Sequence, residues 1–476
     1  MTISERTDCV NVPPARHLQK PRPADTISAM NAVDFSNVFV IVFLAGTAFQ
    51  FVLEQFLEFQ NWRARRKDGA DVPALLSDVP AAASLNKEKR AEIAAYKNAR
   101  YASWIPSSAV SFAVSLALVC TGFYPWIFNI VCRATGIPSG FGSLFACALL
   151  FFVLASLPES LLSLPFELYQ EFVVERRFGF SKMTLRLWIL DELKSLAVSL
   201  VMSAALLAAM SAVLTLLPNQ WWIVLAAVFF AVTLGVQALY PLVVAPLFNT
   251  FTPLADGALK DAISALMERN GFRISGIFVM DASKRSRHSN AYFGGLGKSK
   301  RIVLYDTLVE QLSADELAAV LGHELGHCKL HHILRRVCVM LPAEFLLMFL
   351  LYWCARIPSL YTGFGFAVAP EMVEPLQFLG VFLASLVAAP LGTVFAPLVN
   401  FFSRRDEYAA DRFSARASGM PEALVSGLVK LNIENLSDVQ PSPLYVFWNY
   451  SHPTLLERIA ALKRLAAEPA DSAVRK

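Results

Sequence analysis

Long apolar stretches recur along the whole chain, and they constrain its fold more than any other feature. Each is about as long as a helix needs to be to cross the hydrocarbon core of a bilayer. The seven stretches are Asn37 to Leu53, Trp104 to Cys132, Leu144 to Leu164, Leu193 to Leu217, Trp221 to Tyr240, Val337 to Cys354 and Leu376 to Phe402. One such stretch alone could be a buried core helix. Seven in 476 residues, of which 55% are hydrophobic and 17% charged, predict a predominantly α-helical polytopic membrane protein with seven transmembrane helices.

Lysine and arginine are unevenly distributed between the loops, and this asymmetry orients the spans. The basic residues between the first two spans are Arg63, Arg65, Arg66, Lys67, Lys87, Lys89, Arg90, Lys97 and Arg100. The turn after the second span has only Arg133. Basic loops stay in the cytosol, so we expect a lumenal or outer N-terminus and a cytosolic C-terminus. The net charge of +4 is small and does not indicate nucleic-acid binding.

The spans divide the chain into five segments. These are a disordered tail over 1–36, spans one to five over 37–245, a cytosolic segment over 246–336, spans six and seven over 337–402, and a second cytosolic segment over 403–476. The tail is rich in proline and polar residues and lacks the apolar core of a signal peptide. The seven cysteines include no Cys-x-x-Cys pair, which is typical of small buried side chains and not of a disulfide framework.

A small β-sheet is predicted in the first cytosolic segment. Its strands are Ile277 to Met280, Asn290 to Phe293 and Ile302 to Tyr305. The glycines that turn the chain between strands are Gly294, Gly295 and Gly297. A helix follows the sheet, because Ser313 and Glu316 form a capping-box pattern before an apolar-periodic run.

That helix carries the motif His323-Glu-Leu-Gly-His327. Positions i and i+4 lie on one face of a helix, one turn apart, so both imidazoles can reach one metal ion. Glu324 lies beside them and is free to take a proton from water. The alternative is a chance match on an exposed helix. The choice between a metal site and a chance match therefore depends on the rest of the sequence.

A catalytic zinc site usually has three protein ligands and a fourth position for water. The stretch Glu407-Tyr-Ala-Ala-Asp411 offers the best third ligand, since it places two carboxylates one turn apart on a predicted helix. Glu407 would complete a His-His-Glu site for one zinc ion per chain. Asp411 could hold a ligand imidazole in the required tautomer. The alternative is a solvated acidic face that pairs with Arg404, Arg405 and Arg412.

Two further histidines compete as ligands. His331 and His332 follow the motif directly, and we expect them to continue the same helix. In that position they cannot both converge on one ion with His323 and His327. One of them is therefore expected to support a ligand or to lie on the surface.

The chain resembles one known family in several motifs that occur in a fixed order. These are Phe178-Gly-Phe180, Pro246-Leu-Phe-Asn249, His288-Ser-Asn-Ala-Tyr-Phe293, Arg301-Ile-Val-Leu-Tyr-Asp-Thr-Leu308, His323 to His327, Glu407 to Asp411, and Ser451-His-Pro-Thr-Leu-Leu-Glu-Arg458. Together with seven spans they resemble the Ste24-type CAAX prenyl proteases, the CAAX prenyl protease 1 family of integral-membrane zinc metalloproteases of the M48 type. The family often has an aromatic residue at the position of Cys328 and a glycine at that of His331.

The resemblance implies roles for individual residues. The residues that match zinc ligands are His323, His327 and Glu407, and Glu324 matches the general base. His452 matches a histidine that stabilises the tetrahedral oxyanion, with Arg458 nearby in the same motif. Asn290 and Ala291 match the edge strand along which the substrate backbone lies. Apart from the resemblance, His452 would be an ordinary loop histidine before Pro453.

The resemblance also implies the substrate and the location. Members of the family remove the last three residues from CAAX proteins that carry a farnesyl or geranylgeranyl thioether, in the endoplasmic-reticulum membrane. They enclose a hydrated chamber between their spans. Acidic residues in or beside the spans agree with a chamber, because they would be costly against lipid; these are Glu159, Asp191, Glu192 and Glu344. Each of them could instead pair with a basic residue between helices.

Two other functions remain compatible with the sequence. A membrane quality-control protease would use the same zinc chemistry on substrates that are not prenylated. A seven-span receptor or transporter that keeps the motif as a relic would have no activity.

Overall fold

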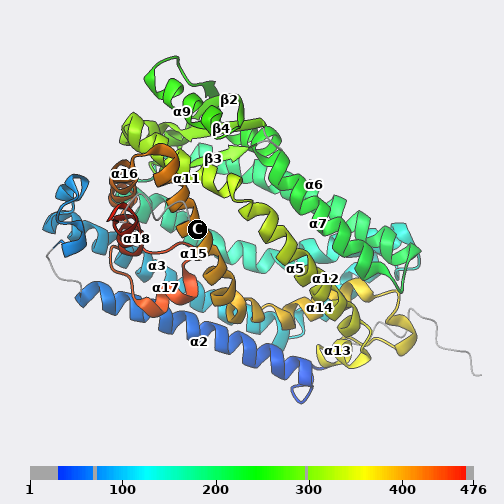
Figure 1. Ribbon diagram of the computed structural model, residues 1–476. Helices are drawn as coiled ribbons and strands as arrows, with labels where there is room; N and C mark the ends of the chain where they lie inside the picture. Colours follow the sequence, from blue (N-terminus) through cyan, green and yellow to red (C-terminus); the bar gives the residue numbers. More distant parts are fainter. Residues whose placement is uncertain (1–30, 68–71, 295–298, 468–476) are drawn as a thin grey trace, which may run out of the picture.

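The structure is a computed structural model that describes residues 31–67, 72–294 and 299–467, most of them helical (Figure 1). Six helical segments are long and apolar enough to cross a membrane, or up to seven if a bent pair is one span, among these residues. The six are α2 (Val38–Lys67), α3 (Lys87–Cys120), α5 (Phe141–Tyr169) continued by the π-helix η3 (Gln170–Glu175), α6 (Leu185–Leu216), α7 (Trp221–Leu239) continued by η4 (Tyr240–Val244) and α8 (Ala245–Phe248), and α12 (His332–Ala355). Between 6% and 28% of the most apolar part of each is buried, so most of these side chains face outward as lipid contact requires. The predicted polytopic membrane fold is confirmed.

The second predicted span is wrong as a single helix over Trp104 to Cys132. Helix α3 ends at Cys120, and a separate helix α4 (Phe123–Thr135) follows. Gly122 lies between them with a φ of 73°, a left-handed conformation that glycine adopts without steric cost. The apolar run continues through this break, so hydropathy alone could not reveal it.

The seventh predicted span is a bent pair and not one straight helix. Helix α14 (Gln377–Ala388) and helix α15 (Leu391–Ser418) differ in direction by 66°. Pro390 stands at the break, where it has no backbone N–H to continue a helix. Helix α15 then runs well past the apolar stretch, and this extension carries Glu407 and Asp411.

The predicted sheet is present and has one strand more than expected. Its strands are β1 (Phe251–Pro253), β2 (Arg273–Met280), β3 (Ala291–Gly294) and β4 (Ser299–Tyr305), in the spatial order β1-β2-β4-β3. Strands β2 and β4 are parallel, whereas β3 runs antiparallel to β4 and lies at an edge of the described sheet. The turn glycines Gly295 and Gly297 lie outside the described residues.

The remaining helices pack around the sheet and at the ends of the spans. They are α9 (Ala258–Arg269), α10 (Asp306–Gln311), α11 (Ala314–Lys329), α13 (Pro358–Gly363), α16 (Pro421–Glu434), α17 (Pro443–Asn449) and α18 (Leu455–Ala467). Short single turns are η1 (Ala74–Leu76), η2 (Pro80–Ser84), η5 (Ala282–Lys284) and η6 (Pro370–Met372). The capping box at the start of α11 is confirmed: Glu316 N donates to Ser313 Oγ at 3.3 Å, and Ser313 N donates to Glu316 Oε2 at 2.8 Å.

Helices α11 and α15 approach each other closely because α11 has glycines on the facing side. A Cβ at Gly326 would lie 3.0 Å from the Cα of Ala410, and one at Gly322 would lie 2.9 Å from the Oγ of Ser414. The Ser414 hydroxyl donates to the carbonyl of Ala319 at 2.5 Å, which ties the two helices together. This contact brings the motif helix face to face with the extension of the last span.

Two sequence expectations outside the site are answered in part. Residues 1–30 of the predicted disordered tail lie outside the described residues, whereas Asp34 N donates to the Gly363 carbonyl at 2.9 Å. Of the acidic residues in the spans, Asp191 pairs with Arg285 through two contacts of 2.8 and 3.1 Å. The hydrated chamber stays a prediction.

Candidate metal centre

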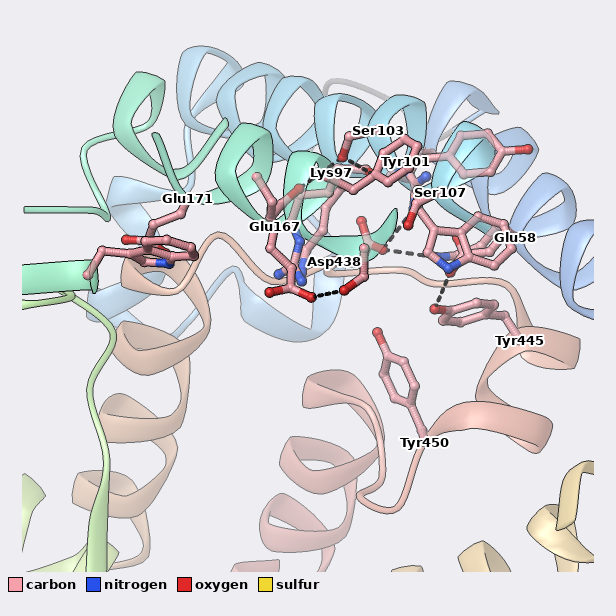
Figure 2. A pocket seen from close by; sticks show the side chains of 18 residues that line it. Glu58, Lys97, Tyr101, Ser103, Ser107, Glu167, Glu171, Asp438, Tyr445 and Tyr450 are labelled. Atoms are coloured by element: carbon pink, nitrogen blue, oxygen red, sulfur yellow. Dashed lines mark hydrogen bonds and ion pairs between the residues drawn. The ribbon is translucent and has the colours of Figure 1, made fainter. Parts of the chain in front are cut away.

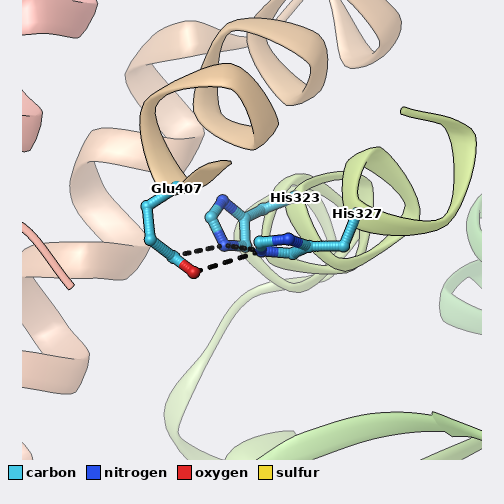
Figure 3. Close-up of side chains that lie close together, drawn as sticks. All are labelled: His323, His327 and Glu407. Carbon is cyan, nitrogen blue, oxygen red and sulfur yellow. Dashed lines mark hydrogen bonds and ion pairs between the residues drawn. The ribbon is translucent and has the colours of Figure 1, made fainter. Parts of the chain in front are cut away.

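Three side chains from two helices converge on one point (Figure 3). His323 and His327 project from the same face of α11, and Glu407 reaches them from α15. The two Nε2 atoms of the histidines lie 3.2 Å apart. Glu407 Oε2 lies 3.2 Å from His323 Nε2, and Glu407 Oε1 lies 3.4 Å from His327 Nε2. The predicted third ligand is thus placed beside the motif, although it lies 80 positions after His327 in the sequence.

The second carboxylate of α15 orients the first histidine. Asp411 Oδ1 lies 2.7 Å from His323 Nδ1, and a carboxylate can only accept at that distance when ionised. Nδ1 of His323 therefore carries a proton, so in the neutral ring the lone pair is on Nε2, which faces Glu407. Arg458 holds Asp411 in turn, donating from Nε to Oδ2 at 2.8 Å and from Nη2 to Oδ1 at 2.6 Å.

His327 is oriented by a histidine whose position the sequence did not reveal. Helix α11 ends at Lys329 and His331 adopts a left-handed conformation with a φ of 55°, so the expectation that His331 and His332 continue the same helix is wrong. The reversal brings His332 Nδ1 to 2.9 Å from His327 Nδ1. His332 Nε2 lies 3.9 Å from Asp406, a buried carboxylate that also pairs with Arg335.

Asp406 was missed by the sequence reasoning, whereas His332 is the one of the two competing histidines that supports a ligand. Asp406 directly precedes Glu407 and has 2% of its surface exposed. An i, i+1 pair of acidic residues points to different faces of a helix, so only one of them was considered. The signal that could have found Asp406 is its charge within an otherwise half-buried helical stretch.

The converging atoms fit a cation. In neutral imidazoles with Nδ1 protonated, both Nε2 atoms are acceptors like the two carboxylate oxygens, and acceptors do not face one another at 3.2 to 3.4 Å without a positive charge between them. Glu407 Oε2 is buried and has no hydrogen-bond donor among the described residues. Two imidazoles and a carboxylate are the donor set of a catalytic zinc site. His323, His327 and Glu407 therefore fit the metal that their spacing predicted.

The pKa values of the two histidines shift in opposite directions, which also indicates that a positive charge belongs between the three side chains. Burial alone would lower the pKa of His323, but hydrogen bonds to Asp411 and Glu407 outweigh burial and raise it to about 9 in the absence of a metal. Burial and the neighbouring His323 lower the pKa of His327 to about 4. Without a metal, a single proton on His323 supplies the positive charge that the cluster needs.

Glu324 lies next to this cluster and is not committed to another contact. Its carboxylate forms no hydrogen bond or ion pair with a described residue. Burial raises the pKa of Glu324 above its ordinary value, and the nearby Glu407 carboxylate acts in the same direction. A carboxylate with a raised pKa is better able to exchange a proton near neutral pH.

His452 reaches the same point from the loop before α18. Its Nε2 atom lies 3.5 Å from Glu407 Oε1, and its Nδ1 atom lies 2.9 Å from the Ser451 hydroxyl. The surrounding protein lowers the pKa of His452, so the ring is neutral at pH 7. A neutral ring whose Nδ1 accepts from Ser451 presents an N–H at Nε2, toward the cluster.

Strand β3 offers a free edge beside the motif helix. Tyr305 N donates to the Asn290 carbonyl at 3.0 Å, so the backbone of Asn290 points toward β4. Alternation in an antiparallel ladder then turns the backbone N–H and carbonyl of Ala291 toward the free edge. At present the Ala291 N–H donates to the Asn290 side chain at 2.8 Å.

Comparison with known protein families agrees with both halves of this architecture. Residues 62–250 match a family described as CAAX prenyl protease N-terminal, five membrane helices. Residues 253–466 match peptidase family M48. The boundary between the two matches falls where the last of the first five spans gives way to the sheet.

Individual relatives match over most of their length. CAAX prenyl protease 1 of Saccharomyces cerevisiae is 34% identical over 427 residues, which cover 87% of this chain and 92% of that protein. The CAAX prenyl protease 1 homolog of Homo sapiens is 31% identical and is covered to 96%. The crystal structure of S. mikatae Ste24p superposes with a TM-score of 0.80 at 33% identity, covering 89% of this chain and 99% of that one.

Proposed function

Because this chain belongs to the CAAX prenyl protease 1 family, within peptidase family M48, and is a membrane metalloprotease, we propose that it removes the last three residues from prenylated CAAX proteins. The observation that carries the proposal is the convergence of His323, His327 and Glu407 beside an uncommitted Glu324. Relatives named for prenylated CAAX substrates support the choice of substrate.

In the proposed site the metal is zinc, held by His323, His327 and Glu407. A bound zinc ion would polarise the scissile carbonyl and lower the pKa of water that it binds. Asp411 keeps the proton of His323 on Nδ1, which leaves Nε2 as the donor atom. Arg458 is a positioning residue in this arrangement, because both of its contacts to Asp411 fix that carboxylate.

Glu324 acts as the general base. It takes a proton from the attacking water and passes it to the nitrogen of the leaving amine, a role for which its raised pKa is suited. The Nε2–H of His452 donates to the oxyanion that forms on the scissile carbonyl. One oxyanion donor is typically worth about 3 kcal/mol of transition-state stabilisation.

The substrate backbone binds along the free edge of β3. A peptide that adds there as a strand would exchange hydrogen bonds with the N–H and carbonyl of Ala291, displacing the side chain of Asn290. Main-chain hydrogen bonds hold any sequence, so selectivity for CAAX proteins has to come from the prenyl group and the chain terminus.

The proposed location is the endoplasmic-reticulum membrane with the site on the cytosolic side. The support is the excess of lysine and arginine in alternate loops, which places the basic segment between α2 and α3 in the cytosol. Helix α11 follows the fifth span and is on the same side in this arrangement. Prenylated CAAX termini also occur on the cytosolic face.

The test is hydrolysis of a farnesylated CAAX peptide by the purified protein. We expect release of the C-terminal tripeptide, its loss with a chelator, and its recovery with added zinc. Glu324→Gln should lower kcat by at least about a hundredfold while zinc content stays at one per chain. The control Glu268→Gln removes an exposed carboxylate from α9 and should leave the rate unchanged.

Two results would contradict the proposal. If zinc-loaded protein releases no tripeptide from the farnesylated peptide, prenylated CAAX proteins are not its substrates. If Glu324→Gln turns over at the rate of the original chain, Glu324 is not the general base. Equal cleavage of the same peptide with and without its farnesyl group would favour the broader quality-control protease.

A further inference from the structure

A polar cavity of about 710 Å³ lies between the membrane helices and the C-terminal part of the chain (Figure 2). Helices α2, α3, α5 and α6 form its membrane-domain walls, and Asp438, Tyr445 and Tyr450 close it from the C-terminal part of the chain. Pockets that bind small ligands and short peptides usually measure about 300–1000 Å³. The cavity is therefore large enough to hold a few residues of peptide.

Two residues of the cavity wall are linked to residues of the proposed active site. Tyr450 lines it and lies two residues before His452, a separation that spans at most about 7 Å of chain. On the other side Gln170 lines it and donates to Glu175 at 2.8 Å. Glu175 lies 3.6 Å from the ring of His288, two residues before Asn290. The cavity wall is thus linked along the chain to His452 and, through Glu175 and His288, to the start of β3.

Lys97, on one wall of the cavity, lies over the ring of Tyr96 at 5.6 Å from its centroid and pairs with no carboxylate among the described residues. Lys97 projects from α3 into the cavity and forms no hydrogen bond or ion pair with a residue that the structure describes. The nearby Asp438 is already occupied, since it accepts from Asn61 and from Arg65, each at 3.1 Å. Glu58 is likewise occupied by the Tyr445 hydroxyl at 2.7 Å. Lys97 is thus available to an anion that enters the cavity.

Another wall carries negative charge. Glu167 projects from α5, where its Oε1 accepts from Ser163 at 2.6 Å and no cation pairs with it among the described residues. Glu171, one turn on, also lines the cavity and accepts from Ser181 at 2.5 Å. Carboxylates on a transmembrane helix are costly against lipid, and here they face a polar cavity. The Lys97 ammonium on α3 and the Glu167 and Glu171 carboxylates on α5 and η3 thus line the same cavity, together with Arg100 of α3.

We propose that this cavity binds the tripeptide released by the reaction, with its C-terminal carboxylate at Lys97 and its new N-terminal ammonium at Glu167. The inference rests on the proposed function. Hydrolysis breaks one C–N bond, adds hydroxyl to the carbonyl carbon and hydrogen to the nitrogen, and the free amine then takes a proton from water. The product therefore carries an ammonium three residues from its C-terminal carboxylate, a position at which the uncleaved substrate has a neutral amide.

Product inhibition tests the site. A tripeptide identical to the last three residues of the substrate is compared with its N-acetylated form, its C-terminal amide, and the form blocked at both ends. We expect the free tripeptide to inhibit cleavage of the farnesylated peptide at least about tenfold more strongly than either singly blocked form, because each block removes a charge-assisted hydrogen bond.

Two substitutions separate the ends of the ligand. Lys97→Met should abolish the preference for the carboxylate over the amide and keep the preference for the free amine, whereas Lys97→Arg should retain both. Glu167→Gln should abolish the preference for the free amine over the N-acetylated form and keep the preference for the carboxylate over the amide. Lys260→Met, on an exposed helix that does not line the cavity, should change neither preference.

Several outcomes would overturn the inference. The first is equal inhibition by all four tripeptides. The second is a loss of affinity in Lys97→Met that is equally large for the tripeptide acid and its amide. The third is a preference for the free amine over the N-acetylated form that disappears with chelator but survives Glu167→Gln. Binding is also measured by calorimetry with the Glu324→Gln variant, which requires no turnover. A chain that binds the free tripeptide but cleaves no prenylated peptide would contradict the proposed function while supporting the cavity.

Discussion

At the scale of single residues, the metal centre depends on side chains that hold the ligands. Asp411 is shared between His323 and Arg458, and only 1% of its surface is exposed. Arg458 donates to both carboxylate oxygens of Asp411. One of these oxygens, Oδ1, also contacts Nδ1 of His323, so the histidine and the arginine share one carboxylate. Removing its charge should disturb the ligand and the arginine together.

Asp411→Asn tests this sharing. The amide oxygen can still accept from His323, but one of the two contacts to Arg458 is lost and the buried guanidinium is left without a counter-charge. We expect zinc affinity to fall by about 10- to 100-fold, measured by competition with a chromophoric chelator. Glu268→Gln is the matched control. If Asp411→Asn binds zinc as tightly as this control, Asp411 does not support the ligand His323.

The raised pKa of His323 predicts that zinc displaces a proton. The folded, metal-free pKa of about 9 lies above the ordinary 6.5, so the charged ring contributes stability that is fully present below about pH 6.5 and is lost as the pH rises through about 9. Zinc needs the neutral ring, so binding at pH 7 should release about one proton, and affinity should rise about tenfold per pH unit up to about pH 9. Calorimetry in buffers of different ionisation enthalpy measures the proton; zinc affinity independent of pH between 6 and 8 would contradict the assignment.

At the scale of elements, the site requires two helices to touch without side chains between them. Gly326 is the fourth residue of the motif, and a Cβ there would meet the backbone of Ala410. Backbone atoms cannot rotate away as a side chain can. Any residue larger than glycine has to separate α11 from α15, and with them the two histidines from Glu407.

Gly326→Ala should therefore weaken both the fold and the site. We expect a loss of about 1–3 kcal/mol in the stability of the helix pair and a lower zinc affinity, measured by thermal unfolding with and without metal. Gly235→Ala in α7, where a Cβ meets no atom within 4 Å, is the control. If zinc stabilises Gly326→Ala as much as it stabilises the original chain, α15 can move away from α11 without weakening the site.

The elements that the sequence predicted well are those with a local signal. Apolar length located most of the spans, the Ser313–Glu316 pair located the start of α11, and two carboxylates one turn apart located Glu407. The break at Gly122 and the reversal at His331 had no such signal, because neither glycine in an apolar run nor histidine after a helix demands a turn. Which of His331 and His332 supports a ligand, and the contact of His332 with Asp406, could not be predicted for the same reason, since both depend on that reversal.

At the scale of the whole molecule, the first span holds the last part of the chain. Asn61 of α2 accepts from Ser442 N at 2.9 Å and donates to Asp438, which also pairs with Arg65. The side chains of Arg65 and Asp438 are each 6% exposed. This buried pair joins segments more than 370 positions apart and sets the C-terminal part, with His452, against the membrane domain.

Asp438→Ala should loosen that junction. A buried arginine left without its partner costs about 3–5 kcal/mol, so we expect a lower midpoint of thermal unfolding in detergent. The double variant Arg65→Met with Asp438→Leu removes both charges and should lose less stability than the single variant. If the single variant unfolds at the temperature of the original chain, the pair does not hold the junction.

The distribution of the metal-binding side chains along the chain also determines when the protein becomes active during its synthesis. His323 and Asp411 are 88 positions apart, and helices α12 to α14 lie between them. At ribosomal rates the motif histidines are made roughly 5–20 s before their partners on α15, and those partners are in place only after the last two membrane insertions. A nascent chain, or one ended by a premature stop codon in that interval, carries both histidines but no third ligand. We expect such products to be inert, so the protease needs no inhibitory propeptide while the ribosome completes it.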